Sequence, residues 1–168
     1  MYTTELKLHP AVARWIDANY EKKGNAYDIR SDSMFILFRT ALYRKNITQR
    51  YKHFKKAESF VPLRIVIDEW DFYHLGWNIP NFSQVRISQM LFDMMMNKFC
   101  DHIAYAYAYG KISRDVTIRR ILVENLFDDE EINYFYIRKW YQRKFQNTGK
   151  ERQVIDFAKY TIENSTQI

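Results

Sequence analysis

The sequence has few of the residues that break helices or cross-link a chain: four glycines, three prolines and one cysteine in 168 residues. A β-sandwich or barrel with many tight turns needs more glycine and proline, so the composition favours helices. The single cysteine, Cys100, excludes an internal disulfide. Its apolar neighbours predict a buried, inert thiol in a reducing compartment.

Long apolar runs are also missing. No run approaches the roughly 18 residues that a membrane-spanning helix needs. The first residues, Met1–Lys7, contain no apolar stretch of signal-peptide length. We therefore expect an intracellular protein, located in the cytoplasm or in a virion, without a membrane partner.

Ready-made catalytic motifs are absent: the sequence has no zinc-protease helix motif, no Cys-x-x-Cys, no glycine-rich phosphate loop and no Gly-x-Ser-x-Gly. Asp68, Asp71 and His74 share a helical spacing that suits a metal ion, but an ordinary acidic helix face ending in histidine explains them as well. The side chains of Cys100-Asp101-His102 point about 100° apart on a helix and form no triad. We expect no catalytic residue, metal ion or cofactor, with a dispersed active site as the remaining enzymatic alternative.

Aromatic residues are abundant, with 13 tyrosines, 12 phenylalanines and 4 tryptophans. Hydrophobic residues make up 47% and charged residues 27%, which is enough apolar material for a sizeable core. Tyrosine packs its ring while its hydroxyl stays hydrated or hydrogen-bonded, so it suits both helix–helix contacts and surfaces that face a partner.

One long helix dominates the predicted architecture. Ser83 is a suitable N-cap and Gly110 a suitable end, which predicts about 27 residues or ~40 Å of helix at about 83–109. Its polar residues fall on one narrow stripe: Arg86, Gln89, Asp93, Asn97 and Asp101. A helix that is apolar around most of its circumference is typically surrounded by others. The sequence therefore predicts an all-α fold, a bundle of about six to eight helices around this central one.

Start signals and apolar spacing place the other helices. We expect them at residues 10–20, from Ser31 or Asp32 onward, at 63–75, at 113–127, at 129–146 and after Gly149. Pro10 suits a first helical turn, Ser113 suits an N-cap, and Asp128 with Glu131 forms a plausible capping box. Residues 63–75 contain an Ile-Val-Ile run that also fits a strand, but their spacing favours a helix. No linker or repeat divides the chain, so we expect residues 1–168 to form one domain.

The net charge is +6, and its distribution is uneven. Residues 33–57 contain no acidic residue and seven basic ones: Arg39, Arg44, Lys45, Arg50, Lys52, Lys55 and Lys56. A segment of one charge sign attracts polyanions or an acidic partner surface. A solvated basic face explains the same pattern equally well.

A second basic surface is expected on the 129–146 helix. Arg138, Lys139, Gln142 and Arg143 share an arc with Phe135, while Tyr134, Ile137, Trp140 and Tyr141 form the core-directed face. An aromatic ring among cationic and amide groups suits phosphate contact combined with base or sugar packing. With the preceding helix this one resembles a helix-turn-helix pair. The joining turn lacks glycine, however, and its acidic residues would repel phosphate.

These patterns predict a non-enzymatic protein that binds DNA or RNA largely through phosphate contacts, without clear sequence specificity. The alternative is a structural subunit or adaptor of a larger assembly that uses its basic and aromatic surfaces on proteins. In its order of an Asp68-Glu69-Trp70 helix, a turn at Gly76 and a long helix, the chain loosely resembles helical adaptors of tailed-phage connectors.

Overall fold

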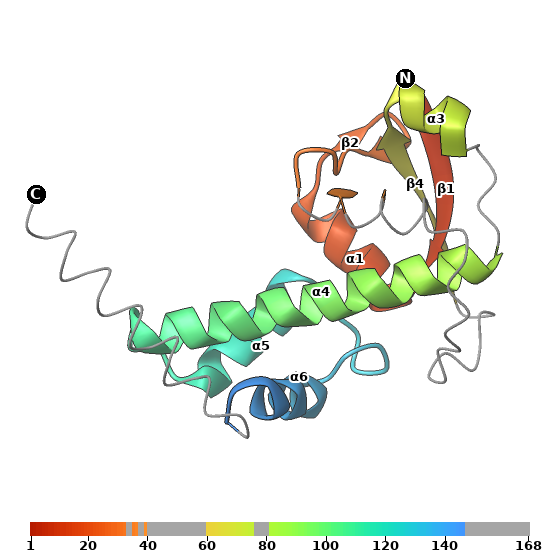
Figure 1. Cartoon of the computed structure of the whole chain (residues 1–168). Coiled ribbons are helices and arrows are strands. Elements are labelled where there is room, and N and C mark those ends of the chain that lie inside the picture. Colours follow the sequence, from red (N-terminus) through yellow and green to blue (C-terminus); the bar gives the residue numbers. More distant parts are fainter. Residues whose placement is uncertain (33–34, 37–38, 40–59, 76–80, 147–168) are drawn as a thin grey trace, which may run out of the picture. The chain divides into compact units, whose positions relative to one another are not determined.

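The computed structural model describes residues 1–32, 35–36, 39, 60–75 and 81–146. The elements along the chain are β1 (Tyr2–Leu8), α1 (Pro10–Asn19), β2 (Lys22–Lys23), β3 (Ala26–Tyr27), β4 (Val61–Ile67), α3 (Glu69–Leu75), α4 (Asn81–Ala108), α5 (Arg114–Glu124), α6 (Tyr134–Tyr141) and a π-helical turn (Gln142–Gln146) (Figure 1). The chain divides into two compact units, Met1–Met95 and Met96–Ile168. A single domain stays a prediction.

The all-α expectation is wrong, because the first unit contains a four-stranded mixed sheet in the order β1-β4-β3-β2. β1 pairs with β4 in antiparallel fashion along its whole length, and the two strands lie side by side in Figure 1. β3 pairs with β4 in parallel and with β2 in antiparallel fashion. Together with the described helices, the sheet makes this a mixed α and β protein rather than a bundle of six to eight helices.

Burial along β1 explains the strand. Thr4, Leu6 and Leu8 are buried while Glu5 and Lys7 are exposed, which is the alternation of a half-buried strand. The sequence pattern predicts no element in the first nine residues, because a strand gains most of its stability from a partner that is distant in sequence.

That partner, β4, overlaps residues 63–75, which the sequence predicts as one helix. The segment instead divides at Asp68, with β4 before it and α3 after it. Leu63 and Ile65 of β4 stand opposite Leu6 and Thr4 of β1. Cross-strand burial therefore outweighs the helical spacing in the first half of the segment.

Two predicted helix positions are confirmed. α1 has Pro10 as its first residue, and the ring nitrogen Nδ1 of His9 accepts a hydrogen bond from the Ala11 N–H at 3.2 Å. The long helix α4 begins two residues before the predicted start and ends one residue before the predicted end. Arg86, expected on its polar stripe, is buried.

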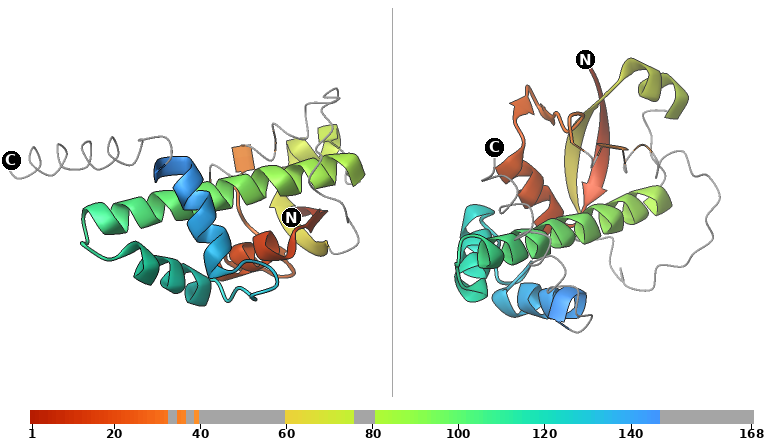
Figure 2. Two further views of the ribbon diagram at one scale, coloured as in Figure 1. Left: turned by 90° about the horizontal axis from the view of Figure 1, so that it is seen from below. Right: turned by 60° about the vertical axis from the view of Figure 1, so that its left-hand side comes forward.

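The second unit contains the end of α4, then α5 and α6, which pack against each other and can be followed in Figure 2. Ser113 caps α5 as expected, since its Oγ accepts a hydrogen bond from the Val116 N–H at 3.3 Å. The prediction of a helix at 129–146 is wrong at its start, because α6 begins at Tyr134. Asn133 caps this helix, and its side chain accepts a hydrogen bond from the Tyr136 N–H at 3.0 Å. Asp128 instead forms a turn, in which its backbone carbonyl accepts from the Glu131 N–H.

Candidate nucleic-acid interface

Of the seven basic residues in the first basic segment, only Arg39 lies among the described residues. Its guanidinium Nε lies 3.0 Å from the carboxylate of Asp71, whose side chain is fully buried. The same guanidinium stands about 6 Å from the rings of Phe35 and Trp70. Arg39 therefore neutralises a buried carboxylate of its own unit. The other basic residues of that segment lie outside the described residues: Arg44, Lys45, Arg50, Lys52, Lys55 and Lys56.

The second basic surface lies on α6 and the turn after it. Arg138, Lys139 and Arg143 are exposed, and Gln142 is half-buried. Phe135 exposes 73% of its surface. Ile137 and Tyr141 occupy the opposite side of the helix and are buried, which leaves the basic side toward solvent.

The sequence predicts Tyr134 on the core-directed face of the helix. In the structure Tyr134 belongs to the basic surface instead. It is half-buried, and its hydroxyl donates a hydrogen bond to the carboxylate of Asp115 on α5. The guanidinium carbons of Arg119 and Arg138 lie 5.4 and 6.0 Å from the centroid of its ring. We call Asp115, Arg119, Tyr134, Phe135 and Arg138 the Tyr134 cluster.

The sequence contains only part of the signal for this cluster. Tyr134 and Arg138 are four residues apart on one helix and are therefore expected neighbours. Arg119 comes from α5, and no spacing rule places it beside Tyr134. The hydrogen bond to Asp115 raises the pKa of Tyr134. The phenol therefore remains a neutral hydrogen-bond donor that links the two helices.

Four cations of this surface form no ion pair with any described residue. In the part of the chain that the structure describes, Arg119, Arg138, Lys139 and Arg143 have no carboxylate within ion-pair distance. Their sequence neighbours differ: Arg120 pairs with Glu124 at 3.3 Å, and Lys144 pairs with Asp101 at 2.7 Å. Uncompensated positive charge creates a potential that attracts an anionic ligand.

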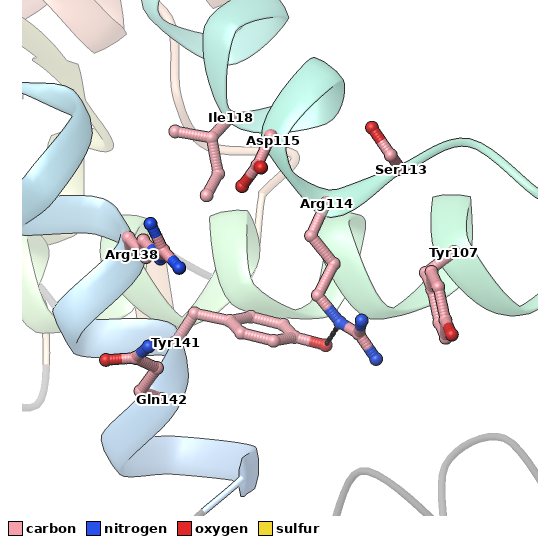
Figure 3. A pocket seen from close by; sticks show the side chains of 8 residues that line it. All are labelled: Tyr107, Ser113, Arg114, Asp115, Ile118, Arg138, Tyr141 and Gln142. Atoms are coloured by element: carbon pink, nitrogen blue, oxygen red, sulfur yellow. Dashed lines mark hydrogen bonds between the residues drawn. The ribbon is translucent and has the colours of Figure 1, made fainter.

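A pocket of about 280 Å³ adjoins the cluster. It is lined by Tyr107, Ser113, Arg114, Asp115, Ile118, Arg138, Tyr141 and Gln142 (Figure 3). The guanidinium carbon of Arg114 lies 3.6 Å from the centroid of the Tyr107 ring, and its Nε donates to the Tyr141 hydroxyl at 3.4 Å. Arg138 belongs to both the pocket and the Tyr134 cluster. The sequence pattern singles out Arg138 and Gln142 but not the pocket, because three separate segments form its walls.

A second pocket, of about 650 Å³, lies in the first unit and includes Lys23, Asp28, Arg30 and Asp68 in its lining. Here the cations are paired: Arg30 pairs with Asp28 at 2.8 Å and with Asp68 at 3.0 Å, and Lys23 pairs with Asp28 at 2.8 Å. Glu21 adds a further carboxylate to the lining. Hydrogen bonds from Arg30 and Lys23 hold the pKa of Asp28 well below its usual range. Among the described residues, both cations of this pocket are therefore paired with carboxylates, and the pocket offers no unpaired cation comparable to those of the α5–α6 surface.

The residues considered for a metal site have separate partners. Asp68 pairs with Arg30 and Asp71 with Arg39, while His74 stacks on Trp70 at 4.0 Å. Among the described residues no group of three metal-ligating side chains occurs.

Cys100 is buried in α4, as its apolar neighbours predict. Burial raises the pKa of its thiol to about 12, so this group is a protonated, poor nucleophile near neutral pH. None of the described helices combines the length and apolarity needed to cross a membrane.

Comparison of the chain with protein-family models, with curated proteins and with solved structures found no match. The α5–α6 surface itself is therefore the basis for any functional assignment.

Proposed function

We propose that this protein binds nucleic acid, without catalysing a reaction, through phosphate contacts made by the exposed side of α5 and α6. The observation that carries the proposal is a surface on which four cations form no ion pair among the described residues and one aromatic ring is exposed. These residues are Arg119, Arg138, Lys139, Arg143 and Phe135. Cations without a carboxylate partner bind phosphate without first breaking an ion pair, and their binding releases counterions from the nucleic acid. The location we propose is the cytoplasm or a virion.

The proposed binding is sequence-nonspecific, and it is not that of a helix-turn-helix. Residues 125–133 connect α5 to α6 and are longer than the roughly three- to four-residue turn of that motif. Four acidic residues in this connection, residues 128–131, precede the N-terminus of α6. Their negative charge opposes insertion of that end into a groove lined by phosphates. Phosphate contacts orient a protein on nucleic acid but do not read its sequence.

A salt titration with duplex DNA of random sequence tests the proposal. We expect log affinity to fall linearly with log salt, with a slope of several units. Replacing Arg138, Lys139 and Arg143 together by glutamine removes the charges that neutralise up to three phosphates. The slope should then decrease by roughly 0.9 for each phosphate that is no longer neutralised.

Arg120→Gln is the matched control, because Arg120 is also exposed on α5 but already pairs with Glu124. It should change the slope by roughly 0.4 or less, under half the effect of one phosphate. Binding no tighter than millimolar at low salt, or an unchanged slope in the triple variant, contradicts the proposal.

A second candidate function is that of a subunit or adaptor whose basic face contacts an acidic protein. The observation that favours it is apolar exposure at and just after α5, where Val116, Val123 and Leu126 expose 56%, 72% and 73% of their surfaces. Exposed apolar side chains near one another are typical of protein contacts. Light scattering over a concentration series tests for self-assembly, and a monomer at every concentration argues against an oligomer.

A further inference from the structure

We infer that the preferred ligand of this surface is single-stranded nucleic acid, with one base stacked on Phe135 and the strand continuing along α6 into the adjoining pocket. This inference rests on the proposed function, because it assigns the type of nucleic acid that the same surface binds.

Phe135 has the features of a stacking platform. It lies in the first turn of α6 and exposes 73% of its surface. The ring of Tyr134 packs against it edge to face, with the two centroids 5.4 Å apart and the planes at 85°. Tyr134 is in turn hydrogen-bonded to Asp115. A large apolar ring is thus held in one orientation while most of it remains in water, and a base that covers it removes that apolar area from water.

An exposed ring of this kind discriminates between single and double strands. In a duplex the bases stack on one another, so their faces are inaccessible and the protein reaches mainly phosphates. In a single strand the unstacked bases pack against aromatic side chains, and stacking adds to the phosphate contacts. The uncompensated cations alone would serve either ligand, whereas Phe135 favours the single strand.

The path of the strand follows from the helix geometry. Phe135, Arg138 and Gln142 are three and four residues apart, so they form one row of roughly 10 Å along the helix. Arg138 stands beside Tyr134 and also lines the pocket. It is therefore placed to bind the phosphate that follows the stacked base.

The pocket at the end of this row has the chemistry for a further nucleotide. The guanidinium carbon of Arg114 lies over the Tyr107 ring, 3.6 Å from its centroid, so a cation held by an aromatic ring lines the pocket. Gln142 supplies an amide that both donates and accepts hydrogen bonds. The pocket volume of about 280 Å³ is slightly below the ~300 Å³ at which pockets for small molecules begin. That size suits one base or one phosphate and excludes a duplex.

The test compares a single-stranded oligothymidine with a random-sequence duplex of equal length at one fixed salt concentration. The wild-type chain should bind the single strand more tightly. Phe135→Ala should weaken single-strand binding roughly 5- to 150-fold and change duplex binding less than about two-fold. Phe135→Trp should retain single-strand binding, because a larger ring still stacks. Arg138→Gln should weaken binding of both ligands, because both present phosphates.

Thermal unfolding of each variant checks the fold, and the exposure of Phe135 predicts that its replacement leaves the melting temperature nearly unchanged. Equal affinity for the two ligands, or equal weakening of both by Phe135→Ala, overturns the single-strand inference while leaving the proposed function intact. Failure to bind either ligand overturns both.

Discussion

Individual arginines of this chain differ in role because of the groups beside them. Arg39 was expected among the phosphate-binding residues, yet it lies against the buried carboxylate of Asp71. Arg138 has no carboxylate partner in the described structure and stands beside Tyr134 and the pocket. A buried carboxylate is costly unless a cation or hydrogen-bond donors satisfy it, so Arg39 contributes to stability. Arg138 remains available for a ligand.

Removing the Arg39 side chain tests that division of roles. Arg39→Ala takes one charged donor from the buried Asp71, and we expect the free energy of unfolding to fall by roughly 1–3 kcal/mol in urea denaturation. Arg64→Ala is the control, because Arg64 forms an exposed pair with Glu5 at 3.9 Å, and its loss should cost at most about 1 kcal/mol. Equal decreases in the free energy of unfolding of the two variants would show that the contact with Asp71 stabilises the fold no more than an exposed ion pair does.

At the scale of elements, the start of α6 determines what the interface presents. Because Asn133 caps the helix, the acidic residues 128–131 lie in the connection before it and not in its first turn. Arg138 and Lys139 then occupy the last turn of α6, where positive charge is favoured by the helix dipole. Phe135 thereby lies on the exposed side of the helix, while Ile137 and Tyr141 are buried in the core.

Replacing the cap distinguishes this start from the one expected at about Asp129, with Asp128 as the cap. Asn133→Ala removes the acceptor for the Tyr136 N–H and should cost about 0.5–2 kcal/mol of stability. Asp128→Ala removes no cap of α6 and should remain within about 0.5 kcal/mol of the wild type. Both values come from chemical denaturation, and a larger effect of Asp128→Ala would place the helix start where the sequence alone predicted it.

At the scale of the whole molecule, the chain has a net charge of +6 and contains two regions rich in basic residues. One is the α5–α6 surface. The other contains six basic residues outside the described part of the chain: Arg44, Lys45, Arg50, Lys52, Lys55 and Lys56. Counterion release counts the phosphates that are neutralised, so a salt slope measures how many cations of each region bind nucleic acid.

We expect both regions to contribute and their effects on the slope to add. Replacing these six residues by glutamine should lower the slope, and combining that change with the Arg138, Lys139 and Arg143 variant should lower it by the sum of the two separate decreases. No change from the six replacements would identify that segment as a solvated basic face. If replacing these six residues alone abolishes the whole salt dependence of binding, an interface on α6 is contradicted.

The helix starts at Pro10 and Ser113 were predictable because a cap acts within a few residues of itself. The long helix was predictable for a similar reason, since 28 residues with few helix breakers carry a strong local preference. The sheet was not predicted. β1 and β4 are separated by more than fifty residues, and their pairing depends on Leu6 meeting Leu63 across that interval.

The sequence by itself determined which residues carry the positive charge and that Phe135 lies among Arg138, Lys139 and Gln142, because helical spacing is a local property. Only the tertiary structure decided which charges remain uncompensated. Arg39 is matched with Asp71 across 32 residues, and Arg119 reaches Tyr134 from another helix. The physical reason is that an ion pair or a ring contact depends on distance in space, which folding brings about between residues far apart in the chain.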